Sequence, residues 1–263
     1  MTGKRHGEGG ARPSRGRGRV RPRTVLLALL ALLAAGAAAL WLTLPDVKAL
    51  AKAPPKSTAF IDLRRREAEA AGHRFALRWS WQPLERISPL LLEAVVLSED
   101  ARFWEHEGVD WDAVEKAAEK NLEKGRMAVG ASTITQQLAK NLFLSPSKNP
   151  VRKLREMLIT HRLETQLSKE RILELYLNVA EWGDGVFGAE AAARRWFGCS
   201  ALELGPMQAA RMALALPNPR QRAPLVHSPV LDRRAARLVK MMEKHGLIDS
   251  AAPDDPAAGA STL

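Results

Sequence analysis

The feature that most limits how this chain can fold is an uncharged apolar segment near its N-terminus, residues 24–44. Its sequence, TVLLALLALLAAGAAALWLTL, has about the 20 residues that a helix needs to cross the core of a bilayer. A cleaved signal peptide is the alternative, because AGAAA resembles a small-residue cleavage site, although the apolar core of a signal peptide usually has only about 7 to 15 residues. We therefore expect a single transmembrane helix at 24–44 that remains attached to the chain.

The positive charge of the chain is concentrated before this segment. Residues 1–23 hold eight basic residues and one acidic residue, which accounts for seven of the eleven net positive charges. Basic residues on one flank of a span mark its cytoplasmic side. We therefore interpret 1–23 as a basic cytoplasmic tail and place the part of the chain after the span on the outer side of the membrane. Because the basic residues lie next to the span, we expect no nucleic-acid partner.

The composition after the span predicts one folded domain with two flexible flanks. Residues 45–59 have the Pro/Lys/Ala mixture of a juxtamembrane linker, and residues 249–263 form a low-complexity tail that we expect to be disordered. The remaining range, 60–248, is long enough for one good hydrophobic core. The only cysteine, Cys199, has no cysteine or histidine at metal-ligand spacing, so neither a disulfide framework nor a zinc site is expected.

Helix-start signals dominate this domain. Proline follows a capping residue at Ser88, Asn149 and Ser228, and capping-box patterns begin at Thr133 and Ser200. These signals predict a mostly α-helical domain of about eight or more helices. The segment 60–82 is also compatible with a short hairpin.

A carboxylate pair, Glu99–Asp100, follows the apolar run LLLEAVVL. Partial burial at this helix end, together with the neighbouring like charge, would raise a carboxyl pKa toward the range of a useful general base. Solvated acids at a helix end are the alternative when this segment is considered alone. Nearby His106 is interpreted as a structural hydrogen-bonding group.

The segment GASTITQQLAKN predicts a helix whose polar face can bind a ligand. Four-residue steps place Ile134 and Leu138 on one stripe, with Gln136 and Lys140 roughly opposite. Ser132 and the following threonine lie at the helix start, where free backbone N–H groups can meet an anion. Simple capping and solvation are equally compatible with this segment alone.

A third segment, NPVRKLREMLITHRLE, brings two cations and one acid to one side of a helix. Arg152 and Glu156 are spaced i,i+4, and Lys153 and Glu156 i,i+3. A solvated helix salt bridge is one interpretation. The other is that the two cations bind phosphate oxygens while the glutamate orients them or assists the reaction.

Together with a fourth segment, these motifs resemble the glycosyltransferase 51 family, the transglycosylases of peptidoglycan synthesis. The family patterns, written loosely as EDxxFxxHxG, GxSTIxQQ, RKxxE and ILxxYLN, are matched in this order at residues 99–108, 130–137, 152–156 and 172–178. The resemblance implies a mostly α, lysozyme-like fold, a lipid II substrate and a site of action at the outer leaflet of the cell inner membrane, with the catalytic domain in the periplasm. It also implies cell-wall synthesis proteins as partners.

The resemblance assigns roles to individual residues. It implies that Glu99 is the catalytic base and that Glu156 is a second acidic residue of the catalytic site. On the matched motifs and the helices that carry them, we expect these substrate-binding residues: Asp100, Phe103, Ser132, Thr133, Gln136, Gln137, Lys140, Arg152 and Lys153. A divalent cation, Mg²⁺ or Mn²⁺, could accompany the substrate diphosphate, although no dedicated ligand cluster is visible in the sequence.

These assignments lead to a specific expectation for the reaction. Glu99 would deprotonate the acceptor hydroxyl, and Lys140, Arg152 and Lys153 would stabilise the departing diphosphate, giving β-1,4 glycan strands with inversion. A membrane-bound lytic enzyme and a non-catalytic adaptor of the wall-building machinery are the alternatives. The tetrad at 145–148 matches the S-x-x-K of penicillin-binding serines, but no K-T-G follows, so we expect a monofunctional enzyme.

Overall fold

The computed structural model describes residues 22–126, 130–147, 149–226 and 228–248. The predicted tail at 249–263 and nearly all of the basic tail lie outside these residues. The chain divides into two compact units, residues 1–43 and 44–263. In the first, α1 (Pro22–Leu42) is long and apolar enough to cross a membrane. It coincides with the predicted span at 24–44 to within two residues at each end.

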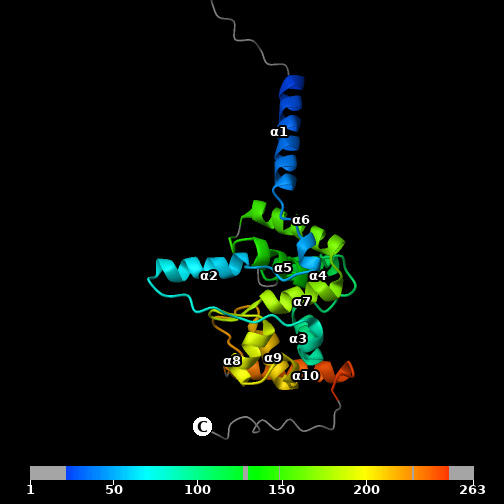
Figure 1. The fold of residues 1–263 in the computed structure, drawn as a ribbon. Coiled ribbons are helices and arrows are strands. Elements are labelled where there is room, and N and C mark those ends of the chain that lie inside the picture. Colours follow the sequence, from blue (N-terminus) through cyan, green and yellow to red (C-terminus); the bar gives the residue numbers. More distant parts are fainter. Residues whose placement is uncertain (1–21, 127–129, 148, 227, 249–263) are drawn as a thin grey trace, which may run out of the picture. The chain divides into compact units, whose positions relative to one another are not determined.

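The second unit confirms the prediction of a mostly helical domain (Figure 1). Its described residues contain nine α-helices: α2 (Ala59–Ala70), α3 (Pro89–Glu99), α4 (Trp111–Glu123), α5 (Ile134–Phe143), α6 (Pro150–Gln166), α7 (Lys169–Val179), α8 (Ala189–Phe197), α9 (Pro206–Ala215) and α10 (Pro229–Lys244). Three short 3₁₀ helices accompany them: η1 (Lys48–Ala51), η2 (Leu84–Arg86) and η3 (Ala201–Glu203).

The folded unit begins earlier than the linker predicted at 45–59 allows. Leu44, Val47 and Leu50 are buried in the hydrophobic core, and the last of them belongs to η1. Arg162 donates to the Leu44 carbonyl, and Arg171 donates to that of Leu50 at 2.7 Å. The Pro/Lys/Ala composition concealed this packing.

The predicted caps explain where several helices start. The Thr133 capping box opens α5, and the side chains of Asn149 and Ser228 accept backbone N–H groups at the starts of α6 and α10. Ser88 behaves differently, because its hydroxyl donates to the carbonyl of Leu204 at 3.0 Å. It therefore links the start of α3 to the segment before α9.

A small three-stranded sheet replaces the hairpin considered for residues 60–82. The strand order is β1–β3–β2, formed by β1 (Arg78–Trp79), β2 (Glu181–Gly183) and β3 (Val186–Phe187). Strand β1 pairs in parallel with β3, and β2 pairs with β3 in antiparallel orientation. The hairpin prediction was wrong because α2 occupies most of the segment and the partner of β1 lies about 100 residues away along the chain.

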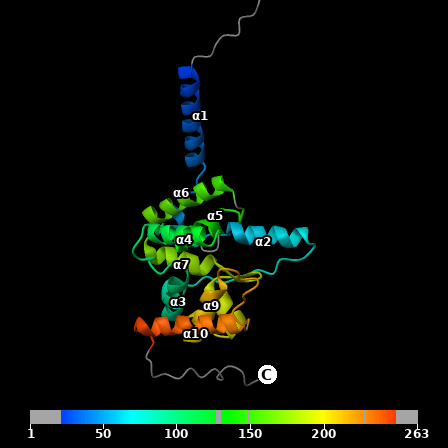
Figure 2. The ribbon, with the colours of Figure 1, turned by 180° about the vertical axis from the view of Figure 1, so that it is seen from behind.

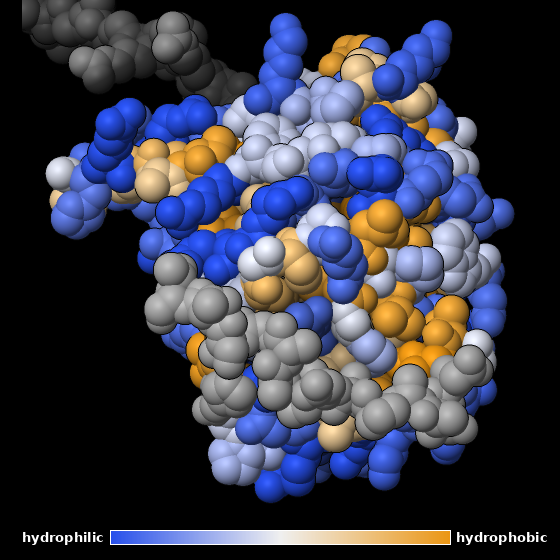
Figure 3. Space-filling model, turned by 60° about the horizontal axis from the view of Figure 1, so that its bottom comes forward, coloured by the Kyte–Doolittle hydropathy of each residue, from blue (hydrophilic) through white to orange (hydrophobic). Residues whose placement is uncertain are grey.

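Two groups of helices share the core of the second unit. Helix α5 packs against α6 and α7, whereas α9 packs against α3 and α10 (Figures 1 and 2). The predicted stripe on α5 is buried, with Ile134 and Leu138 fully enclosed. Seen from the end formed by α8–α10, the surface is largely hydrophilic and is interrupted by groups of hydrophobic residues (Figure 3). The end of α3 meets α5, and the predicted catalytic residues lie there.

Candidate active site

Glu99 is the last residue of α3 and is held against α5. Its Oε2 atom accepts a hydrogen bond from Nε2 of Gln137 at 2.8 Å. The Oε1 atom of Gln137 in turn accepts from the Tyr176 hydroxyl at 3.0 Å. Because the tyrosine is almost completely buried in α7, it fixes which end of the Gln137 amide faces Glu99. The carboxylate therefore has a defined position.

The environment of Glu99 suits a general base. Burial raises its pKa above the ordinary value, and the negative charge of Asp100 acts in the same direction. The hydrogen bond from Gln137 and the charge of Lys140 oppose this shift without cancelling it. The raised pKa predicted from the sequence is thus found, and it makes the ionised carboxylate a better proton acceptor than a solvated one.

Asp100 supports the site rather than facing a ligand. Its side chain is buried and accepts the backbone N–H of Ile134 at 2.9 Å. It also pairs with Nε2 of His106 at 2.9 Å, while Nδ1 of this histidine accepts the N–H of Gly108. Nε2 therefore carries the proton and donates it to Asp100. This arrangement anchors the start of α5 and confirms the structural role predicted for His106.

Phe103 does not line a binding surface in this structure. Its side chain is fully buried, and its ring lies edge-on to Trp104 with the Nζ atom of Lys169 4.5 Å from the ring centroid. The assignment to substrate binding is corrected, because a fully enclosed ring cannot contact a ligand. Phe103 belongs instead to the hydrophobic core.

The residues at the start of α5 divide between structural and accessible positions. Thr133 is buried, caps α5 and donates from its hydroxyl to the carbonyl of Gly108 at 2.7 Å. Gln136 completes the capping box and is only 4% exposed, so the expected polar face is smaller than the helix pattern suggests. Ser132 is exposed. Of these three, it is the residue best placed to meet a ligand.

A cluster of cations lies next to Glu99. Lys140 is one helical turn beyond Gln137 on α5, and its Nζ atom is 5.8 Å from the centre of the Phe60 ring. On α6, Arg152 and Lys153 both donate to the buried carboxylate of Glu156. We call these three cations and Glu156 the cation cluster. The sequence patterns identified all four members of the cluster. They did not indicate that Phe60 lies beside Lys140 or that the Tyr176 hydroxyl donates to Gln137.

The charges of Glu99 and of the α6 residues act on the same lysine, Lys140. Burial lowers the pKa of Lys140, and the positive charges of Arg152 and Lys153 add to this effect. Glu156 and Glu99 both oppose it. Lys140 therefore lies close enough to Glu99 and to the α6 residues for both to influence its charge.

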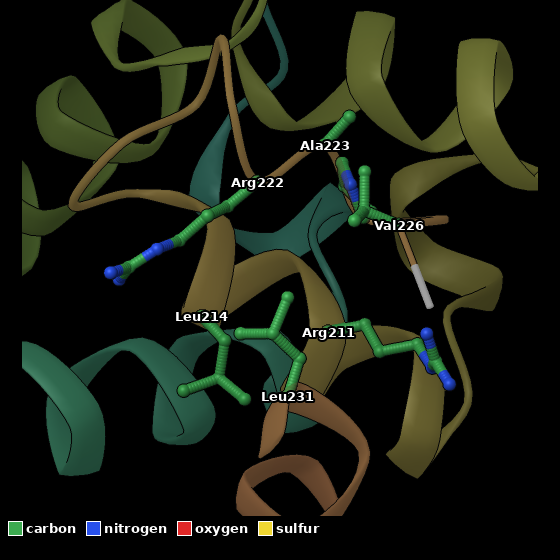
Figure 4. Close-up of a pocket in the computed structure, with 7 residues that line it drawn as sticks. Arg211, Leu214, Arg222, Ala223, Val226 and Leu231 are labelled. Atoms are coloured by element: carbon green, nitrogen blue, oxygen red, sulfur yellow. The ribbon is translucent and has the colours of Figure 1, made fainter. Parts of the chain in front are cut away.

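A groove with a volume of about 940 Å³ adjoins the cation cluster. Ser132, Gln136 and Lys153 line one part of it, and mainly apolar residues of α4, including Trp111 and Leu122, line another. By contrast, the hollow between α9, α10 and the loop before α10 has a volume of about 10 Å³ and is shown in Figure 4. That hollow is about the size of one water molecule.

The donor atoms of the site do not form a metal centre. Among the residues that the structure describes, no group of three His, Cys, Asp or Glu side chains could hold a metal ion. Glu156 is already bound by two cations, and Glu99 accepts from Gln137.

Comparisons with known proteins agree with this geometry. The transglycosylase family model matches residues 64–243. A biosynthetic peptidoglycan transglycosylase of Aromatoleum aromaticum is 55% identical over 167 residues, which cover 64% of this chain and 73% of the relative. Proteins with the same description from Nitrosospira multiformis and Chromobacterium violaceum are 51% and 50% identical over 188 residues, or 72% of this chain and 82% of each relative. The chain therefore belongs to the transglycosylase family and is a peptidoglycan glycosyltransferase.

Proposed function

We propose that this enzyme polymerises lipid II into β-1,4 glycan strands and that Glu99 is its general base. The observation that carries the proposal is the meeting of the half-buried, oriented carboxylate of Glu99 with the cation cluster on α5 and α6. The ionised carboxylate removes the proton from the 4-hydroxyl of the acceptor sugar as that oxygen attacks the anomeric carbon of the donor. A single displacement inverts an α-linked donor to a β-linked product.

The cation cluster serves the leaving group. A departing polyprenyl diphosphate gains negative charge in the transition state, and fixed cations stabilise that charge more than they stabilise the ground state. The buried Nε–H of Arg152 finds no acceptor among the described residues. Since a buried donor is costly when unpaired, this N–H supports binding of a phosphate oxygen there.

Glu156 is assigned to positioning. Its carboxylate is 3% exposed and accepts from both Arg152 and Lys153. Because each of its two oxygens accepts from one of the cations, we assign it the role of holding Arg152 and Lys153 in place.

The apolar helix α1 serves as a single-pass anchor in the cell inner membrane. The basic residues before it place the N-terminus in the cytoplasm and the catalytic unit in the periplasm. Both substrates carry polyprenyl tails, so confinement to the same membrane raises their effective concentration at the site. Cell-wall synthesis proteins are the expected partners, and Mg²⁺ or Mn²⁺ would enter with the substrate diphosphate.

Labelled lipid II tests the proposal directly. Full-length protein in detergent should convert it into long strands that a β-1,4-specific muramidase degrades, with release of polyprenyl diphosphate. A strand that resists the muramidase would contradict inversion. Release of muropeptides from purified sacculi without any strand synthesis would instead identify a lytic enzyme, and partner binding without either reaction would identify an adaptor.

A further inference from the structure

Helix α2 brings an aromatic ring to the cation cluster. Phe60 is the second residue of α2, and the Nζ atom of Lys140 lies over its ring, 5.8 Å from the centroid. Helix α2 packs against α5, which carries this lysine (Figures 1 and 2). A cation within about 6 Å of a ring centroid is attracted by the negative charge of the ring face. Phe60 therefore interacts with a proposed catalytic cation, although it lies outside the four sequence motifs.

Contacts on both sides of this ring fix its position along α2. Before it, the hydroxyl oxygen of Thr58 accepts the N–H of Ile61 at 3.1 Å, and the isoleucine is almost completely buried. One turn after it, the Nε atom of Arg64 donates to both carboxylate oxygens of Glu181, and Nη2 donates to one of them at 2.7 Å. Glu181 is buried and begins β2. The core and β2 therefore hold the ring in place independently of its contact with Lys140.

The surroundings of Lys140 disfavour its charge. The side chain is half-buried, and burial lowers its pKa. The titratable groups around it come from three helices: Glu99 on α3, Arg152, Lys153 and Glu156 on α6, and Tyr176 on α7, whose hydroxyl donates to Gln137 one turn before Lys140. The two α6 cations lower the pKa of the lysine further, and the two glutamates raise it. The ring face contributed by α2 adds a second kind of support for the ammonium form.

An aromatic partner suits a cation that must also bind a ligand. A carboxylate in contact with Lys140 would stabilise its charge, but it would accept its N–H groups and offset the charge that a diphosphate needs. A ring face has no net charge and leaves the three N–H donors of the ammonium group for phosphate oxygens. Glu99 and Glu156 act on Lys140 through their charge alone, because neither accepts a hydrogen bond from it within the part of the chain that the structure describes.

From these contacts we propose that Phe60 is a positioning residue of the transfer reaction, whose ring face holds the ammonium group of Lys140 charged and in place for the leaving diphosphate. This inference rests on the proposed function, because it requires Lys140 to stabilise that leaving group. Phe60 acts through the lysine and not on the substrate. Its removal should therefore slow the step in which charge develops, which lowers kcat more than it changes KM.

Phe60→Leu tests the ring while it keeps an apolar side chain beside Lys140. In strand synthesis from labelled lipid II, kcat should fall about five-fold at neutral pH, the scale of one partly shielded cation–π contact. Without the ring face the pKa of Lys140 should fall further, so the basic limb of the pH profile should move about half a unit to lower pH. Phe60→Tyr retains an aromatic ring and should keep the wild-type kcat and basic limb.

Phe75→Leu is the matched control. Phe75 is also half-buried, and its ring lies beside Gly185, between β2 and β3. The same substitution there should leave kcat and the basic limb unchanged. Assays below the lowest melting temperature of the variants keep unfolding out of the comparison, and Phe60→Met provides a second non-aromatic side chain if Phe60→Leu does not fold.

Lys140→Ala separates this inference from the proposed function. If Lys140→Ala keeps the wild-type kcat, the lysine does not stabilise the leaving group, and its part in the proposed function fails together with this inference. If Lys140→Ala is slow but Phe60→Leu keeps the wild-type kcat and basic limb, only the role of Phe60 is wrong. A loss that Phe60→Tyr shares with Phe60→Leu would also overturn that role, because the aromatic face would not be the property that matters.

Discussion

Replacing Glu99 with glutamine removes the proposed base while preserving its surroundings. The two side chains have nearly the same shape, and the amide oxygen of the new residue can still accept from Gln137, which Tyr176 holds in orientation. A positioned general base typically contributes about 10²- to 10⁴-fold in rate, which corresponds to about 3–5 kcal/mol of transition-state stabilisation. The loss should therefore appear in kcat, with little change in KM.

The same substitution should not destabilise the protein at neutral pH. The folded-state pKa of Glu99 lies above the unfolded value because of burial. Such a group contributes stability that is complete below the unfolded pKa and is lost as the pH rises through the folded one. At pH 7 the ionised, half-buried carboxylate therefore carries a cost that glutamine removes. We expect Glu99→Gln to be at least as stable as the wild type at pH 7, with any advantage shrinking toward pH 4.

Strand synthesis from labelled lipid II and chemical denaturation at several pH values measure these two effects. Asp62→Asn, which changes a half-exposed acid on α2 that pairs with Arg65, provides a control for the loss of one negative charge outside the proposed site. A Glu99→Gln enzyme that retains more than about a tenth of wild-type kcat would contradict the role of this carboxylate, given the usual size of the effect. A large loss of stability at pH 7 would show instead that the charge is structurally required.

Four further predictions concern the site and its supports. Tyr176→Phe removes the hydroxyl that orients the amide beside Glu99, so kcat should fall about ten-fold while stability changes by about 1 kcal/mol, as measured by kinetics and denaturation. In the pH profile of kcat/KM, activity should fall on the acid side as Glu99 is protonated, at a pH above the ordinary pKa of a glutamate. Activity should fall on the basic side as Lys140 is deprotonated, at a pH below the ordinary pKa of a lysine. A flat profile across both regions would be inconsistent with these roles. Arg64→Ala leaves the carboxylate of Glu181 buried without its bidentate partner. The free energy of unfolding, measured by denaturation, should fall by about 3–5 kcal/mol, and replacing both residues with apolar ones of similar size should restore most of it. EDTA should leave the melting temperature of the substrate-free protein unchanged, and a fall of several degrees would reveal a metal held by the protein alone.

The sequence predicts the helices of this enzyme well because their signals are local. Thr133 and Gln136 lie three residues apart, and their reciprocal hydrogen bonds form within one turn. The proline that follows Asn149 is also a local signal, because the two residues together mark the start of α6. Local signals also place Glu156 beside Arg152, because i,i+4 residues meet on any helix.

Contacts between distant segments could not be predicted in this way. Nothing near Phe103 in the sequence shows that its ring is buried in the hydrophobic core, so a core residue was assigned to the binding surface. Asp100 likewise reaches the N–H of Ile134, 34 residues away. The β1–β3 pairing joins segments about 100 residues apart. β1 and β3 have two residues each, which is too few to show the alternation of apolar and polar side chains that identifies a strand in a sequence.

The link between the two halves of the active site follows from the way α5 is anchored. Gln137 donates to Glu99, and Lys140 lies three residues later, so the helix rise sets Gln137 and Lys140 about 4.5 Å apart along the axis of α5. The start of this helix is fixed by the capping box and by the carboxylate of Asp100, which itself adjoins Glu99 in the chain. The residue before the anchor is therefore the proposed base, and the helix that the anchor holds carries Lys140. Because a shift of α5 would move Gln137 and Lys140 relative to Glu99 on α3, we expect Asp100 to act on the site by fixing the position of α5.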